Sequence, residues 1–205
     1  MSGPGRPIVL TAALLGMTGH STDRLVHRAT AGVLDHCLSE LGGQCLHHTA
    51  DRLQLLMPTA TTTLDVAFLL KLNLLSLRRQ PQEPRVDAHI GIGLARLDPT
   101  ALNLNALRPA LQLDRDALGL PSSTPLLCRL LNLELSRLQP KQAQALLAQR
   151  YSGKTTQQQQ AQWVRDRYLL PCSRTSLCKR LERGNATLIG DTMDWLKQEA
   201  GNAHA

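Results

Sequence analysis

Aromatic side chains are scarce in this chain of 205 residues. Phe, Tyr and Trp make up only 2% of it, although hydrophobic residues as a class make up 42%. That apolar content excludes a wholly disordered chain, so we expect a folded core built from Leu, Ala and Val. Long apolar runs are also missing, because no stretch approaches the roughly 20 residues needed to span a bilayer. We therefore expect no membrane partner.

A cysteine framework is missing as well. The five cysteines are odd in number, and no two of them have the C-x-x-C spacing. This pattern argues against disulfides and a zinc site, and it favours reduced thiols in the cytoplasm. The apolar segment 8–15 is followed by no clear cleavage site, so we expect a buried strand there rather than a signal peptide. No cofactor is expected from these features.

Positive charge is concentrated in the last third of the chain. Residues 1–135 contain 12 Lys and Arg against 11 Asp and Glu, whereas residues 136–205 contain 11 against 5. The net charge of +7 therefore consists of +1 in the first segment and +6 in the second. A localised basic field favours binding to the phosphate backbone of nucleic acid. A basic module that binds an acidic protein is the alternative.

Apolar periodicity in residues 1–98 predicts alternating strands and helices. Continuous or alternating apolar runs indicate strands, and apolar residues three and four apart indicate helices. The order strand, helix, strand, strand, helix, strand is typical of the ferredoxin-like (βαββαβ) fold, an antiparallel sheet with helices on one face. The predicted elements are a strand at 8–15, a helix from Thr22 or Asp23 to Leu41, strands at 44–48 and 52–57, a helix at 61–79 and a strand at 85–97.

The rest of the chain is predicted to be all helical, which makes the whole protein an α+β protein. We interpret 99–138 as a helical connector, with a helical segment at 101–117 and a Leu-rich segment at 126–138 that could dimerise. Residues 139–205 are predicted to form a helix-turn-helix DNA-binding domain. Four of the five aromatic residues lie in this part, so we expect it to build a separate small core. Its predicted helices are 139–152, 155–168, 174–183 and 185–199.

The segment Pro171–Gly184 has the pattern of a recognition helix. Ser173 is placed to cap the helix by accepting a hydrogen bond from a free backbone N–H. Leu177 and Leu181, four residues apart, give one apolar face. The remaining surface is mostly basic and hydroxylated, which suits a helix that packs on a small domain and meets a polyanion. An ordinary solvated basic helix is the alternative interpretation.

The DNA-contacting residues follow from the geometry of a helix-turn-helix. Its second helix lies in the major groove and contacts base edges from its first turns. Residues further along such a helix contact phosphate, which positions the protein without reading sequence. A single unit of this kind makes few contacts, so we expect a homodimer on double-stranded DNA. The predicted base-reading residues are Arg174, Thr175 and Ser176, and the predicted phosphate-binding residues are Lys179, Arg180, Arg183, Arg165, Arg167 and Lys154.

Several short motifs resemble the SatD-like family of bacterial proteins. They are GGQCLHHTADRLQLLMP at 42–58, RVDAHIGIGLARL at 85–97, Thr156-Gln157, and the helix from Ser173 to Leu181. The resemblance implies a ferredoxin-like domain related to nucleotide cyclases, followed by a carboxy-terminal helix-turn-helix. It implies a transcriptional regulator whose first domain dimerises or senses a small-molecule or nucleotide ligand.

The chain departs from a catalytic cyclase at the positions that would bind metal. Such enzymes place one acid on the first strand and another at the hairpin turn, so that two carboxylates hold two metal ions. Segment 8–15 contains no acid, which leaves Asp51 alone. We expect Asp51 to be a turn residue, only a weak metal candidate, and the protein not to be an enzyme. The alternative is a nucleotide-binding or nucleotide-cyclising enzyme that uses Asp51. His47 and His48 point to opposite faces of a strand and are not expected to share a metal.

Overall fold

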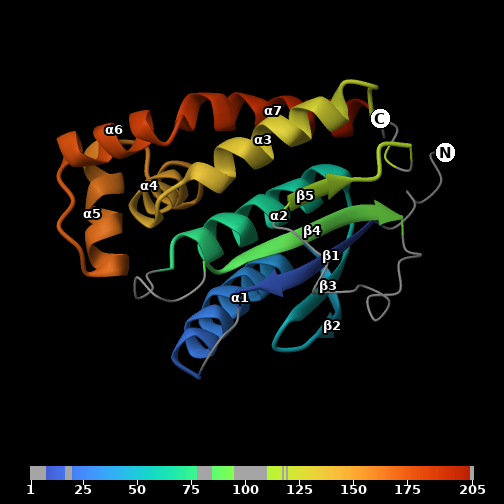
Figure 1. Ribbon diagram of the computed structural model, residues 1–205, viewed down its shortest axis with the longest axis horizontal. Coiled ribbons are helices and arrows are strands. Elements are labelled where there is room, and N and C mark those ends of the chain that lie inside the picture. Colours follow the sequence, from blue (N-terminus) through green and yellow to red (C-terminus); the bar gives the residue numbers. More distant parts are fainter. Residues whose placement is uncertain are drawn as a thin grey trace.

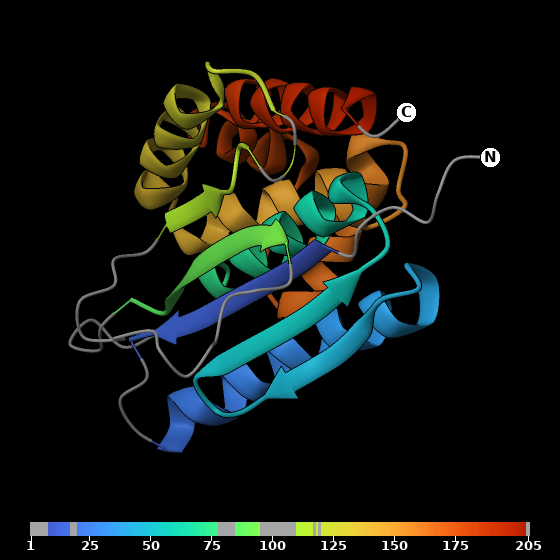
Figure 2. The same cartoon turned by 90° about the vertical axis from the view of Figure 1, so that its right-hand side faces the viewer.

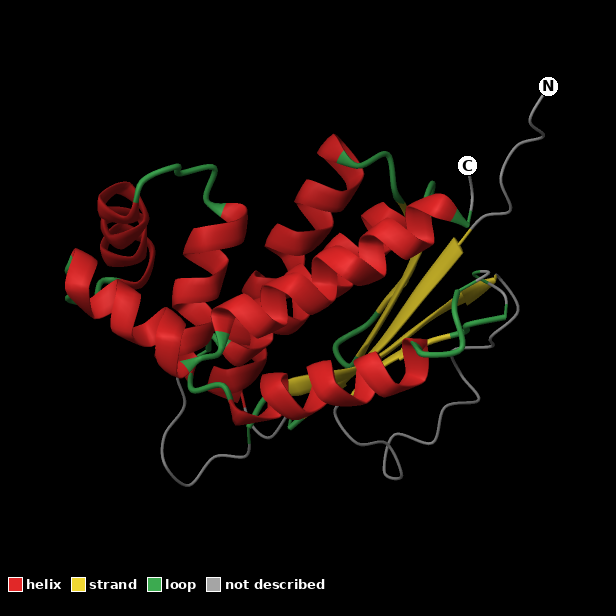
Figure 3. Ribbon diagram, turned by 90° about the horizontal axis from the view of Figure 1, so that it is seen from above, coloured by secondary structure: helices red, strands yellow, loops and turns green. Residues whose placement is uncertain are grey.

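The computed structural model describes residues 8–16, 20–77, 85–94, 110–116, 118 and 120–203. They form a mixed α+β protein with a five-stranded sheet and seven helices. The strands gather on one side of the molecule, and the helices of the last third extend away from them (Figure 1 and Figure 3). The predicted α+β class is confirmed at this level.

The first strand of the chain lies at the centre of the sheet. The strands are β1 (Ile8–Leu15), β2 (Gln44–His48), β3 (Arg52–Met57), β4 (Asp87–Leu94) and β5 (Ala110–Leu113). Their order is β2-β3-β1-β4-β5, and all neighbours are antiparallel except β4 and β5, which are parallel. β1 is buried along its length except at its last residue, as its continuous apolar sequence predicts.

Two helices lie behind the sheet when its strands face the viewer (Figure 2). They are α1 (His20–Glu40) and α2 (Ala60–Leu75), which contact each other. α1 also contacts β2, whereas α2 contacts β1, β3 and β4. α1 ends one residue before its predicted end at Leu41, and Gly42 follows with a positive φ of 66° that favours glycine.

The last five helices form a layer that packs onto the other side of α2 through two of its members. They are α3 (Thr124–Arg137), α4 (Pro140–Tyr151), α5 (Gln157–Tyr168), α6 (Arg174–Arg183) and α7 (Ala186–Asn202). Both α4 and α7 contact α2, and buried residues from the sheet through to α7 form one continuous cluster. The prediction of a separate small core was therefore wrong. α2 is buried on almost every side because it lies between the sheet and these helices.

The element boundaries confirm most of the predicted pattern and correct several parts of it. The predicted helix at 101–117 was wrong at 110–113, where the chain forms β5; residues 101–109 lie outside the described residues. α1 begins at His20, two residues before the earliest predicted cap. The predicted helix at 61–79 ends earlier than expected, because α2 stops at Leu75 and residues 76–77 are not helical. The predicted strand end at 95–97 lies outside the described residues.

Candidate nucleic-acid interface

The helices α4, α5 and α6 pack against one another in pairs and form a three-helix unit. α4 begins at Pro140, where a missing backbone N–H costs nothing. The Gln139 backbone N–H donates to the Gln142 side chain at 2.6 Å, which satisfies a donor at the start of α4. Thr156 caps α5 by accepting a hydrogen bond from the Gln159 backbone N–H at 3.3 Å.

The helix predicted to read DNA is formed with the predicted bounds. Ser173 caps α6 by accepting a hydrogen bond from the Ser176 backbone N–H at 3.1 Å. Leu177 and Leu181 are both buried and attach the helix to the rest of the unit. Thr175, on the opposite face, is exposed. The cap and the apolar face are therefore confirmed.

A groove lies between the start of α4 and the length of α6. We name it the α4–α6 groove, and its volume is about 540 Å³. None of the described residues that line it is acidic, and four of them are cationic. The cations and the hydroxyl groups that matter most are Lys141, Lys179, Arg180, Arg183, Thr175 and Ser176. Five of these six come from the predicted site.

Three of the four groove cations have no protein partner within the described part of the chain. Lys141, Lys179 and Arg183 are exposed and make no hydrogen bond or ion pair there. Unpaired cations in one groove raise the local positive potential and attract anions. The groove is therefore an open electropositive surface rather than a network of closed salt bridges.

Two predicted phosphate ligands instead hold the connection between α5 and α6. The Arg180 guanidinium donates to the Pro171 carbonyl oxygen at 2.9 Å and to Cys172 Sγ at 3.3 Å. Arg165 donates to the Cys172 carbonyl oxygen at 3.0 Å. These hydrogen bonds fix the segment that sets the angle of α6. Arg180 still lines the groove, but Arg165 does not.

Arg174 lies beside the groove and joins the first residues of two helices. Its Nε donates to Gln157 Oε1 at 3.2 Å. Since Gln157 begins α5 and Arg174 begins α6, the connection must run back alongside α5. It spans five residues, 169–173, slightly longer than the three or four of a short helix-turn-helix turn. Leu169 ends α5 with a positive φ of 51°, and the chain changes direction there.

Lys154 and Arg167 lie apart from the α4–α6 groove. Both line a separate hollow on α5 that includes Trp163. The Arg167 guanidinium lies 5.1 Å from the centre of the Trp163 ring and 5.9 Å from that of Tyr168, which are cation–π distances. The structure thus brings five of the nine predicted residues together in the groove and leaves four outside it.

Sequence reasoning missed two charged features. Lys141 contributes to the groove although no predicted contact lies on α4. The only local signal in the sequence was its position next to the proline that starts a helix.

The second missed feature is a buried ion pair between Lys71 on α2 and Asp87 on β4. Lys71 Nζ and Asp87 Oδ1 are 2.6 Å apart, and each side chain is 4% exposed. Burial lowers the pKa of Lys71, and the Asp87 carboxylate partly offsets that effect. Lys71 Nζ also donates to the Ala88 carbonyl oxygen, which helps to compensate the buried charge.

Asp51 lies in the turn between β2 and β3. Its carboxylate accepts a hydrogen bond from the Thr49 hydroxyl at 3.0 Å, an interaction within the turn. No group of three or more His, Cys, Asp or Glu side chains that could hold a metal occurs among the residues the structure describes. Asp51 therefore has no assembled ligand set around it in this part of the molecule.

The comparisons with known proteins give no relative. No protein-family model, curated protein or solved structure matches this chain. Within the described ranges, no helix combines the length and the apolar character needed to cross a membrane. The functional argument therefore depends on the groove itself.

Proposed function

We propose that this protein is a DNA-binding transcriptional regulator that contacts double-stranded DNA through the α4–α6 groove. The observation that carries the proposal is the set of unpaired cations on that groove. Lys141, Lys179 and Arg183 come from two helices, share one concave surface and have no acidic residue among its described lining. A duplex supplies regularly spaced phosphates to such a surface.

The positions of residues along α6 support base contacts at its first turn and phosphate contacts further on. Its first turn carries Thr175 and Ser176 on the groove, where hydroxyl groups can donate to or accept from base edges. Lys179 and Arg183 lie one and two turns further on and suit phosphate contacts. Arg174, beside Gln157, is the guanine-reading candidate and would exchange its contact with Gln157 for a base.

The amino-terminal part is proposed to be a non-catalytic dimerisation or sensing module. The order β2-β3-β1-β4 with antiparallel neighbours supports a ferredoxin-like arrangement for the first four strands, and β5 then extends the sheet beside β4. Descent from a SatD-like, cyclase-related ancestor remains part of this proposal. So does the homodimer, which would double the few contacts of one groove.

Binding and footprinting with random and selected duplex DNA test the proposal. We expect the full chain to bind random duplex at low salt and to lose affinity steeply as salt rises. Arg174→Ala should relax the base preference of selected sites, with a loss of about 1–3 kcal/mol at the contacted position. Arg129→Gln is the control, because Arg129 is exposed on α3 and does not line the groove. An unchanged footprint and affinity in Arg174→Ala would refute the recognition-helix assignment.

A further inference from the structure

A second cleft lies between α1 and the hairpin formed by β2 and β3. Its volume is about 610 Å³, within the range of about 300–1,000 Å³ typical of sites for small molecules. One wall comes from a single face of α1, since Arg24, His27, Arg28 and Ala31 are spaced three or four residues apart. The other wall comes from the end of β2 and the turn after it. The cleft is distinct from the α4–α6 groove, with which it shares no lining residue.

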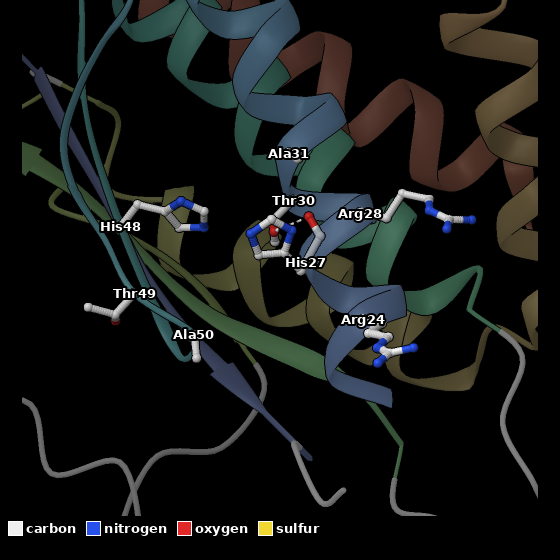
Figure 4. Close-up of a pocket in the computed structure, with 8 residues that line it drawn as sticks. All are labelled: Arg24, His27, Arg28, Thr30, Ala31, His48, Thr49 and Ala50. Carbon is white, nitrogen blue, oxygen red and sulfur yellow. Dashed lines mark hydrogen bonds between the residues drawn. The ribbon is translucent and has the colours of Figure 1, made fainter. Parts of the chain in front are cut away.

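Two imidazole rings lie on the facing walls of this cleft. His27 on α1 and His48 on β2 have ring centres 5.9 Å apart and ring planes inclined by 32°. Figure 4 shows the two rings directed toward each other from the helix and from the hairpin. The β2–β3 pairing shifts register between Cys45 and His47, and such bulges re-aim the side chains that follow them. The rings thus offer flat apolar surfaces with polar edges.

The cleft is positively charged and lacks internal compensation. Arg24 and Arg28 line it, and neither forms an ion pair within the described residues. None of its described lining residues is acidic. Burial lowers the pKa of His48, and the neighbouring His27 and His47 lower it further. A bound anion would offset the two uncompensated guanidinium charges of Arg24 and Arg28.

The surfaces between the charges are largely apolar. Ala31 and Ala50 face the space from the helix and from the turn. The Thr30 hydroxyl donates back to the Val26 and His27 carbonyl oxygens at 3.0 Å, so it is occupied within its own helix. A ligand that fills this space must therefore combine a flat apolar body with a negative group.

We propose that this cleft binds a small planar organic anion, with its ring against His27 and His48 and its acidic group at Arg24 and Arg28. The proposal is independent of DNA binding, because it concerns a different surface and different residues. It assigns the amino-terminal domain a ligand of defined chemistry.

The test uses 8-anilinonaphthalene-1-sulfonate, an aromatic anion with a planar naphthalene ring, and the full chain labelled with ¹⁵N. We expect saturable binding, with amide shifts confined to α1 around His27 and to the β2–β3 turn around His48. Arg28→Gln and His48→Gln should each weaken binding about tenfold, as expected for losing a charged or stacking contact. Arg129→Gln should bind like the parent, and the amide spectrum of each variant reports whether it is folded.

Two competition arms separate the parts of the proposal. Salicylate, an aromatic carboxylate, should displace the probe, whereas inorganic phosphate at the same concentration should not. Displacement by phosphate as effective as that by salicylate would show recognition of charge alone and would overturn the proposed ligand class. Shifts located outside this cleft, or folded Arg28→Gln and His48→Gln variants that bind as the parent does, would refute the site. Since no DNA is present, a negative result leaves the α4–α6 groove proposal untouched.

Discussion

The two ends of α4 both carry a cation, but the protein uses them in opposite ways. At the start, Lys141 is exposed on the α4–α6 groove and has no partner among the described residues. At the end, the Arg150 guanidinium donates two hydrogen bonds to the Asp194 carboxylate on α7, at 2.8 and 2.9 Å. Gly190 leaves the space for it, because a Cβ there would lie 2.4 Å from an Arg150 nitrogen. One end is closed onto the protein, and the other is open to a ligand.

Other cations among the described residues show the same difference between paired and open positions. Paired cations fasten layers to one another: Lys71 joins α2 to β4, and Lys197 on α7 lies 2.7 Å from Asp65 on α2. Unpaired cations instead collect on the α4–α6 groove and on the cleft beside α1. A count of Lys and Arg cannot separate these classes, because the partner decides the role.

The largest expected effect concerns the most deeply buried paired cation. Lys71→Met should destabilise the protein by about 3–5 kcal/mol, because it leaves the Asp87 carboxylate buried without its partner. Urea unfolding measures this loss. The double variant Lys71→Met with Asp87→Asn should recover part of the stability, since the uncompensated charge is gone. Simple additivity of the two single losses would contradict the account of this pair.

Arg165→Met separates a positioning role from a phosphate contact. We expect a loss of about 1 kcal/mol in unfolding free energy, because the hydrogen bond to the Cys172 carbonyl oxygen is removed. DNA affinity should fall while the dependence of affinity on salt stays the same. A reduced salt slope would instead show that Arg165 binds phosphate, as the sequence predicts.

Lys141→Gln tests the open end of α4. Its unfolding free energy should stay within about 0.5 kcal/mol of the parent, as is usual for exposed positions. Affinity for all duplex sequences should fall, and the salt slope should decrease by about one because one phosphate contact is lost. Fluorescence anisotropy across a salt series measures both quantities. An unchanged slope would remove α4 from the interface.

Arg150→Met tests the closed end and should have the smallest effect on DNA binding. The loss of stability should be about 0.5–1 kcal/mol, since Asp194 is 59% exposed and solvent screens the pair. The hydrogen bond from Arg150 holds the pKa of Asp194 below its usual value of 3.8. The pair therefore stabilises the protein above about pH 4 and loses its effect as pH falls through the lowered pKa. Thermal unfolding between pH 2 and 7 should show a smaller acid dependence in the variant, and an equal dependence would contradict this reasoning.

Features set by local sequence were predictable, and features set by distant contacts were not. α6 follows from a capping serine and two leucines four residues apart, all within one segment. β5 has only four residues, and the Asn132 side chain on α3 pairs with both the backbone N–H and carbonyl of Leu111. The apolar periodicity of the segment does not predict these hydrogen bonds, because they come from a residue on another element. For the same reason the sequence does not identify Asp87 as the partner of Lys71.

The candidate site was predictable on one helix only. Residues on α6 could be assigned because a helix fixes which side chains share a face. Lys141 joins them through the packing of α4 against α6, which spacing along the chain does not encode. Arg165 and Arg180 were assigned to phosphate from their charge, whereas the fold gives both a carbonyl acceptor in the connection before α6.

The most direct test compares the salt slope of DNA affinity in two variants with the parent. One variant replaces the three open cations by glutamine: Lys141→Gln, Lys179→Gln and Arg183→Gln together. The other is Arg150→Met, which removes a closed cation. If DNA binds in the α4–α6 groove, the salt slope of DNA affinity falls by about three in the triple variant and stays unchanged in Arg150→Met. Equal slopes in all three proteins, or no binding by the parent at low salt, would contradict binding in this groove.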